Sequence, residues 1–137
     1  MKKAYFDSSA IIKLGHFESE SHALIDYLGQ DQLSLATSII ADVEVRRTLN
    51  RLRAVGADPD EHVRGFFLLD LSRDVRDRAV ELGSIVLRSI DAIHVASALT
   101  IEADIDFVTY DKRQAAAARD VGLRVVQPGR TVDEKGP

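Results

Sequence analysis

The sequence contains no cysteine and no tryptophan, and only 6% of its 137 residues are aromatic. The absence of cysteine excludes disulfide frameworks, zinc–thiolate sites, iron–sulfur clusters and thiol nucleophiles. Long apolar runs are also missing: in the second half, the longest stretch without acidic or basic side chains is 92–101, far short of the ~20 residues of a membrane-spanning helix. The start, Met1-Lys2-Lys3, lacks the apolar core of a signal peptide. We therefore expect a soluble, cytoplasmic protein with no membrane contact.

Basic charge is in short supply as well. Lys and Arg number 18 against 22 Asp and Glu, which gives a net charge of −4. A protein that coats nucleic acid by bulk charge is expected to be clearly basic, so the mild acidity argues against this class. The histidines lack the spacing of metal ligands, which argues against zinc. We expect His94, within an apolar stretch, to be a hydrogen-bonded core residue.

Short apolar runs alternate with helical segments along the whole chain. The expected strands are 4–6, 33–36, 66–71, 107–109 and 123–126. The expected helices are 10–14, 19–28, 39–54, one opening at 58–59 that carries His62 and Val63, then 73–86, 89–103 and 114–119. This alternation predicts an α/β fold, a three-layer α/β/α sandwich with a mostly parallel central sheet. We expect one domain over 1–129 and a flexible polar tail over 130–137.

Acidic residues stand where this fold brings ligands. Asp7 and Asp111 each follow a predicted strand, and ligands of such sheets bind beyond the carboxyl ends of the strands. Asp91 lies in the first turn of an apolar helix, and Glu44 borders the apolar face of another. Each also has an ordinary explanation, as a helix cap or as a member of a surface ion pair. Carboxylates that converge raise each other's pKa, and Mg²⁺ or Mn²⁺ would neutralise them.

Five stretches resemble the PIN-domain family, in particular the VapC-type ribonuclease toxins of type II (VapBC) toxin–antitoxin pairs. They are 5–10 (YFDSSA), Thr37-Ser38 with Glu44 in the following helix, 87–99 (LRSIDAIHVASAL), 107–113 (FVTYDKR) and 117–129. The resemblance covers nearly the whole chain in order. It implies that the protein is a metal-dependent endoribonuclease, with an antitoxin as its partner and a homodimer as its assembly.

The resemblance also assigns roles to individual residues. It implies that Asp7, Glu44, Asp91 and Asp111 hold one or two Mg²⁺ or Mn²⁺ ions, which activate water for phosphodiester hydrolysis. Four acids in one pocket leave the remainder of the chain with no net charge. By the same resemblance Ser9 and Thr109 orient a carboxylate or a metal-bound water, although a purely structural role for either hydroxyl stays open.

Basic residues near the acids are candidate contacts for RNA phosphates. They are Lys13, Arg46, Arg47, Arg51, Arg53, Lys112 and Arg113. For any single arginine, a solvated charged face is an equally good explanation. Tyr110 is the one aromatic residue expected to be free to stack on a base.

Two other classes of protein remain open on the residues alone: a phospho-acceptor or phosphatase-type α/β domain, and a non-catalytic interaction domain. A phosphatase-type domain also ends its first strand in Asp, but it would carry a second Asp where this chain has Ser9. A receiver domain would carry paired acids before its phospho-acceptor, which are absent. A non-catalytic interaction domain on the same fold would be favoured by the loss of the acids, and all four are present.

Overall fold

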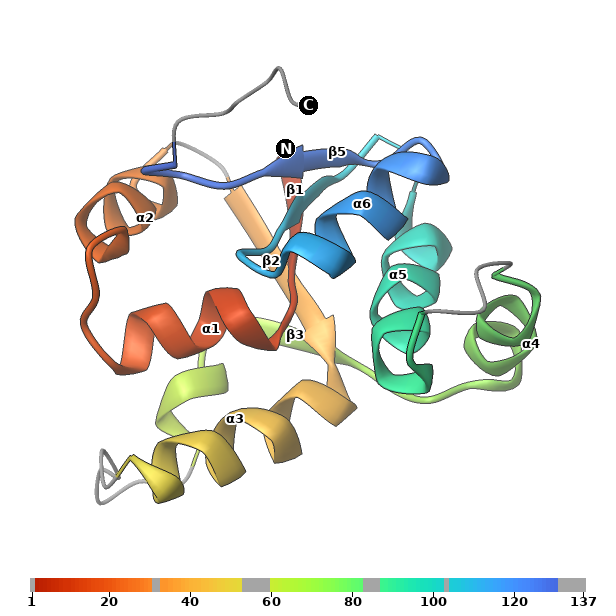
Figure 1. Cartoon of the computed structure of the whole chain (residues 1–137), viewed down its shortest axis with the longest axis horizontal. Helices are drawn as coiled ribbons and strands as arrows, with labels where there is room; N and C mark the ends of the chain where they lie inside the picture. The colour runs from red at the N-terminus through yellow and green to blue at the C-terminus, as the bar shows by residue number, and fades with distance from the viewer. Residues whose placement is uncertain (1, 31–32, 53–59, 83–86, 103, 131–137) are drawn as a thin grey trace.

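A single five-stranded sheet forms the centre of the molecule (Figure 1). The computed structural model describes residues 2–30, 33–52, 60–82, 87–102 and 104–130. The strands are β1 (Lys2–Phe6), β2 (Leu33–Ser38), β3 (Phe66–Leu69), β4 (Asp106–Val108) and β5 (Arg124–Val126). They lie in the order β3-β2-β1-β4-β5, and all four pairings are parallel. The predicted parallel sheet is confirmed.

Helices cover both faces of this sheet. They are α1 (Ser8–Gly15), α2 (Ser21–Leu28), α3 (Ile39–Arg51), the 3₁₀ turn η1 (Glu61–Val63), α4 (Arg73–Glu81), α5 (Ser89–Ile101) and α6 (Lys112–Asp120). In β1, Phe6 packs into a core with α1, α2 and α3, while Tyr5 packs into a second core with α5 and α6. Because successive strand residues face opposite sides, the two cores confirm the three-layer sandwich.

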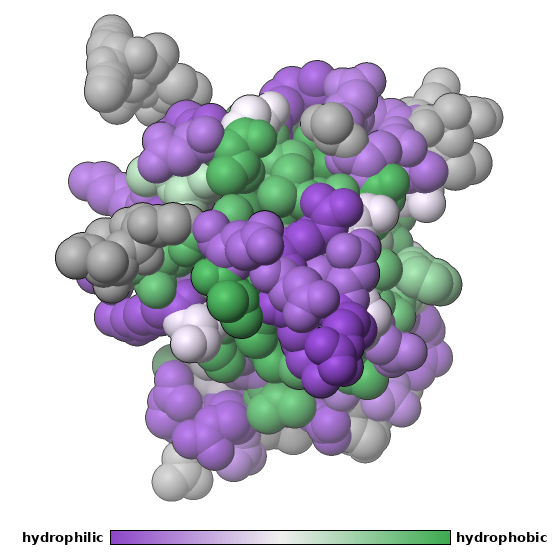
Figure 2. Space-filling model, turned by 90° about the vertical axis from the view of Figure 1, so that its right-hand side faces the viewer, coloured by the Kyte–Doolittle hydropathy of each residue, from purple (hydrophilic) through white to green (hydrophobic). Residues whose placement is uncertain are grey.

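The exposed α4 lies outside both cores. Only Val75 of this helix is buried, and its charged outer surface forms the hydrophilic cluster near the centre of Figure 2. Among the described residues, no helix is long and apolar enough to cross a membrane.

Several element boundaries differ from the sequence predictions. The helix expected at His62 is the single 3₁₀ turn η1, which is fastened to α3 by His62 Nε2, 3.1 Å from Asp42 Oδ1. The strand expected over 66–71 ends at Leu69, because Leu69 pairs with Ser38, the last residue of β2. The helix expected over 73–86 ends at Glu81, since Leu82 is extended. Residues 53–54, 83–86 and 103, at the ends of predicted helices, lie outside the described residues.

The direction of winding reverses beside β1. The chain runs from β1 through β2 to β3 on one side, then returns to place β4 and β5 on the other. In open α/β sheets this reversal point opens a crevice at the carboxyl ends of the two strands. Asp7 follows β1, and residues 109–111 follow β4. The fold therefore brings Asp7 and the segment with Asp111 together, as the sequence predicted.

Candidate active site

Asp7 is the most buried of the four acids. Its side chain caps α1 by accepting a hydrogen bond from the Ala10 amide at 3.2 Å. Ser9 Oγ donates to the same oxygen, Oδ1, at 2.7 Å, and Thr109 Oγ1 donates to Oδ2. Burial raises the pKa of the carboxyl, against the effects of His94 and of these donors. The capping role and the site role proposed for Asp7 are thus compatible, because a carboxylate has lone pairs for both.

The two hydroxyls on Asp7 also fix the segment after β4. Ser9 Oγ accepts a hydrogen bond from the Tyr110 amide at 2.8 Å, and Thr109 Oγ1 accepts one from the Asp111 amide at 3.1 Å. Ser9 and Thr109 therefore lie on a carboxylate, where the sequence analysis expected them. These hydrogen bonds join the start of α1, just after β1, to residues 109–111, which follow β4.

Glu44, on α3, is held through one of its oxygens. Oε1 accepts a hydrogen bond from Ser8 Oγ and lies 2.8 Å from His94 Nε2. Burial opposes ionisation of Glu44, but the hydrogen bonds from His94 and Ser8 outweigh it and lower the pKa of the carboxyl. Ser8 and His94 were not predicted as site residues, because their contact with Glu44 spans 36 and 50 residues of sequence.

His94 is buried, 2% exposed, as expected for a core residue. Its second ring nitrogen, Nδ1, lies 2.6 Å from the hydroxyl of Tyr5, and Ser8 Oγ is 3.3 Å from Nε2. The expectation of a hydrogen-bonded core histidine is confirmed. No pattern in the sequence indicates that one of its partners is Glu44.

Asp91 and Asp111 share an open pocket of about 550 Å³ that is otherwise lined by cations. The cations are Arg88, Lys112 and Arg113. Burial raises the pKa of Asp91, and the neighbouring charge of Asp111 raises it further. Asp111 also caps α6, accepting from the Gln114 amide at 2.9 Å. Arg88 was missed by the sequence analysis, although it lies only three residues before Asp91.

The donor set suits a hard divalent cation. All four acids offer carboxylate oxygens, which Mg²⁺ and Mn²⁺ prefer. Burial, and then the charges of Asp111 and Glu44, raise the pKa of Asp91, against the effects of His94 and Arg88. Among the described residues, however, no three His, Asp or Glu side chains are already gathered at metal-ligand spacing. The chemistry of the site fits the cation, and the carboxylates would have to draw closer around it.

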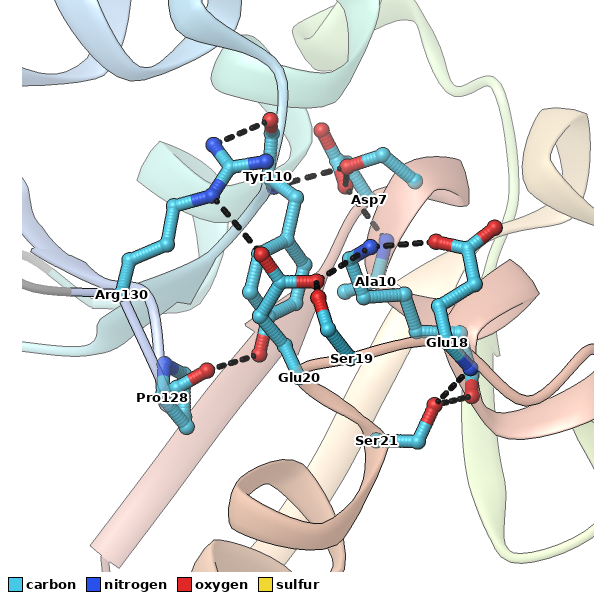
Figure 3. A network of polar contacts seen from close by, with 11 residues as sticks. Asp7, Ala10, Glu18, Ser19, Glu20, Ser21, Tyr110, Pro128 and Arg130 are labelled. Carbon is cyan, nitrogen blue, oxygen red and sulfur yellow. Dashed lines mark hydrogen bonds and ion pairs between the residues drawn. The ribbon is translucent and has the colours of Figure 1, made fainter.

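Lys13, a predicted RNA contact, is engaged elsewhere. Its ammonium pairs with Glu18 and Glu20, and its side chain is only 9% exposed. It also lies 4.8 Å from the centre of the Tyr110 ring. Its partners Glu18 and Glu20 are labelled in Figure 3. The structure therefore gives Lys13 a role in packing rather than a free charge.

Tyr110 is not free to stack on a base, which corrects the expectation. The ring is buried, and its hydroxyl donates to the Pro128 carbonyl at 2.7 Å. Arg130 donates to the Tyr110 carbonyl at 2.8 Å and contacts Glu20 at 3.3 Å (Figure 3). Arg130, predicted to begin a flexible tail, is thus tied to the domain, and residues 131–137 lie outside the described residues.

The predicted arginines of α3 fall into two groups. Arg46 forms an ion pair with Asp42, one turn earlier, at 3.0 Å. Arg47 and Arg51 line a second, more apolar pocket that also includes Glu44. Its apolar residues are Ile39, Ile40, Val43, Leu71 and Ile90. Arg53 lies outside the described residues.

Comparison with known proteins identifies the family. The PIN domain family matches residues 4–120, and the chain belongs to this family. Ribonuclease VapC46 of Mycobacterium tuberculosis (strain ATCC 25618 / H37Rv) is 37% identical over 133 residues, which cover 93% of this chain and 99% of that protein. Ribonuclease VapC47 of Mycobacterium tuberculosis (strain CDC 1551 / Oshkosh) is 36% identical over 136 residues, covering 91% of this chain and 96% of that protein.

A solved structure shares the fold. A chain of a toxin–antitoxin complex from Klebsiella pneumoniae superimposes with a TM-score of 0.68, covering 94% of this chain and 99% of that one at 21% identity. The resemblance to VapC-type PIN domains read from the sequence is confirmed.

Proposed function

We propose that the protein is a metal-dependent endoribonuclease, the toxin of a toxin–antitoxin pair. The observation that carries this proposal is the pocket in which Asp91 and Asp111 stand among Arg88, Lys112 and Arg113. Phosphodiester hydrolysis requires carboxylates that can bind a cation and basic side chains that can bind phosphates. This open pocket contains side chains of both kinds. The ribonuclease names of its relatives support the same activity.

Asp7, Glu44, Asp91 and Asp111 would hold one or two Mg²⁺ or Mn²⁺ ions. When bound, such a cation would lower the pKa of a water and offset the charge that builds on the phosphate oxygens. Thr109 and Ser9 keep Asp7 in one orientation, and Ser8 with His94 keeps Glu44 ionised. Hydrolysis leaves a 3′-hydroxyl and a 5′-phosphate and needs no attack by the ribose 2′-hydroxyl.

The cations flanking the acids bind the RNA backbone in this proposal. Arg88, Lys112 and Arg113 line the acidic pocket, while Arg47 and Arg51 line the second pocket together with Glu44. With Tyr110 buried, we propose that RNA is recognised by shape and backbone more than by stacking on aromatic rings.

The partners follow from the same proposal. The resemblance to a chain of a toxin–antitoxin complex supports a cognate antitoxin that restrains the enzyme. A homodimer and a location in the cytoplasm complete the proposal.

The decisive experiment uses protein purified free of antitoxin. We expect it to cleave RNA with Mg²⁺ or Mn²⁺ and to stop when EDTA is added. Mn²⁺ should also raise its melting temperature, because the ion binds the folded state alone. The variant Asp91→Asn should lose both effects while staying folded by circular dichroism.

Arg119→Ala serves as a matched control, since Arg119 is exposed at the far end of the helix that carries Lys112 and Arg113. It should cleave as the wild type does. No cleavage at any Mg²⁺ or Mn²⁺ concentration would disprove the nuclease. Phosphatase activity that requires Asp7 would favour the phospho-acceptor class, and binding without chemistry would favour the interaction domain.

A further inference from the structure

We infer that His94 is a positioning residue for Glu44, held by the Tyr5 hydroxyl in the tautomer that places its proton on Nε2. The inference rests on the proposed function, in which Glu44 is a metal ligand. It concerns a buried histidine and a buried tyrosine that take no direct part in the reaction.

The contacts leave one oxygen of Glu44 for the site. Ser8 and His94 both contact Oε1, and the described residues place no donor on Oε2. The side chain of Glu44 is 32% exposed, whereas that of His94 is 2% exposed. The carboxylate is therefore held on its buried side through Oε1, and Oε2 is the oxygen left to bind a cation.

Hydrogen-bond counting fixes the tautomer of His94. An ionised carboxylate only accepts, so Nε2, 2.8 Å from Glu44 Oε1, must carry a proton. The Tyr5 hydroxyl lies 2.6 Å from Nδ1. A protonated Nδ1 could not accept from this hydroxyl, which would then have to turn its proton toward the hydroxyl of Ser97 or Thr37. Donation from Tyr5 to Nδ1 satisfies both Nδ1 and the Tyr5 hydroxyl.

Packing holds Tyr5, the donor to His94, in place. The ring of Tyr5 stacks on Phe107 with centroids 5.4 Å apart and planes 8° apart, and it meets His94 edge-on at 5.8 Å. Tyr5 and Phe107 are fully buried and stand opposite each other in neighbouring strands. The hydroxyl of Tyr5 therefore has little freedom to leave Nδ1.

The chain Tyr5–His94–Glu44 also links three elements that carry acids. Tyr5 lies two residues before Asp7 at the end of β1, and His94 lies one helical turn after Asp91 on α5. Glu44 lies on α3. One hydrogen-bonded chain thus sets the position of Glu44 relative to the strand of Asp7 and the helix of Asp91.

The first test is spectroscopic and needs neither metal nor RNA. The ¹⁵N shifts of the histidine rings distinguish the tautomers, and the His94→Gln variant assigns the signal of His94 by its loss. We expect a protonated Nε2 and an unprotonated Nδ1, and in Tyr5→Phe we expect the Nδ1 signal to change. A ring protonated on Nδ1 would overturn the inference.

The second test measures Mn²⁺ affinity by calorimetry on folded variants. His94→Leu should weaken binding by about 10–100-fold, the usual cost of losing a partner that orients a metal ligand. His94→Gln, whose amide can donate from the place of Nε2, should recover most of this loss. Tyr5→Phe keeps the stacked ring, and its Mn²⁺ affinity should be several-fold weaker than that of the wild type.

A double-mutant cycle separates positioning from general damage to the core. In the Glu44→Ala background, His94→Leu should cause no further loss of Mn²⁺ affinity. Additive losses, or equal losses in the Gln and Leu variants, would refute the positioning role even if the wild type cleaves RNA. If His94→Leu causes no further loss in the Glu44→Ala background but the wild type cleaves no RNA, the proposed function is refuted and the positioning role stands.

Discussion

The four acids divide into two pairs that the protein treats differently. Asp7 and Glu44 receive hydrogen bonds from side chains that lie in other elements of the fold, namely Thr109, Ser8 and His94. Asp91 and Asp111 instead face an open pocket lined by three cations. The inner pair is fixed by hydrogen bonds, and the outer pair is balanced by charge.

The difference suggests a division of work within one site. Hydrogen bonds from buried hydroxyls and a buried ring determine where a carboxylate oxygen points, and salt screens them little. Charge balance in an open pocket sets how strongly phosphates and cations are attracted, and it is screened by salt. Substitutions in the inner pair should therefore change chemistry, and substitutions around the outer pair should change affinity and its salt dependence.

The largest expected effect comes from Asp7→Asn. We expect RNA cleavage to fall by more than the roughly 100-fold that loss of a ligand's hydrogen-bonding partner costs. The fold should survive, because the Asn carbonyl can still accept from Ala10 and Ser9. A variant that retains more than a tenth of wild-type cleavage would remove Asp7 from the inner pair.

The same variant should change the pH dependence of stability. Because burial raises the folded-state pKa of Asp7 above its ordinary 3.8, the folded state binds a proton more tightly than the unfolded state. The contribution of Asp7 to the free energy of unfolding therefore falls as pH rises from 3.8 through the folded-state pKa. Without divalent metal, Asp7→Asn should melt higher than wild type at pH 7, and the gap should close near pH 4. A gap that widens on acidification would contradict this sign.

The outer pair is probed by Lys112→Gln and Arg88→Gln. We expect KM for RNA to rise several-fold with kcat nearly unchanged. If each side chain contacts one phosphate, each change should lower the slope of log affinity against log salt by about 0.7, the value for single strands. Arg119→Gln, on the same helix as Lys112 but at its far end, is the control and should leave the slope unaltered. An unchanged slope in Lys112→Gln would show that Lys112 makes no phosphate contact.

The smallest effect is expected from Ser9→Ala. The change removes the bond to Asp7 Oδ1 and the acceptor of the Tyr110 amide. Thr109 and Ala10 still hold Asp7, so we expect a loss of about 1 kcal/mol in the free energy of unfolding and a modest fall in kcat. Thermal melting and steady-state kinetics measure the two, and a fall in kcat as large as that of Asp7→Asn would place Ser9 on a par with the acids.

Sequence patterns captured the layers of the fold and the positions of Asp7 after β1 and Asp111 after β4, because both depend on local signals. Asp7 and Asp111 were found since each follows an apolar run, and the parallel sheet followed from alternation. Contacts between distant residues left no such signal. Packing across the molecule determines three such features: the contact of His94 with Glu44, the ion pairs of Lys13 with Glu18 and Glu20, and the burial of Tyr110.

Because Thr109 reaches Asp7 across 102 positions of the chain, the order of synthesis matters. On the ribosome, β1 emerges long before β4, one of the two strands beside it, and before Arg130, which donates to the Tyr110 carbonyl. Contacts of such long sequence separation form late and slowly in folding. A growing chain therefore carries Asp7 and Asp91 before Thr109 and Asp111 have been synthesised. The surroundings of these two acids are complete only after those later residues have been added.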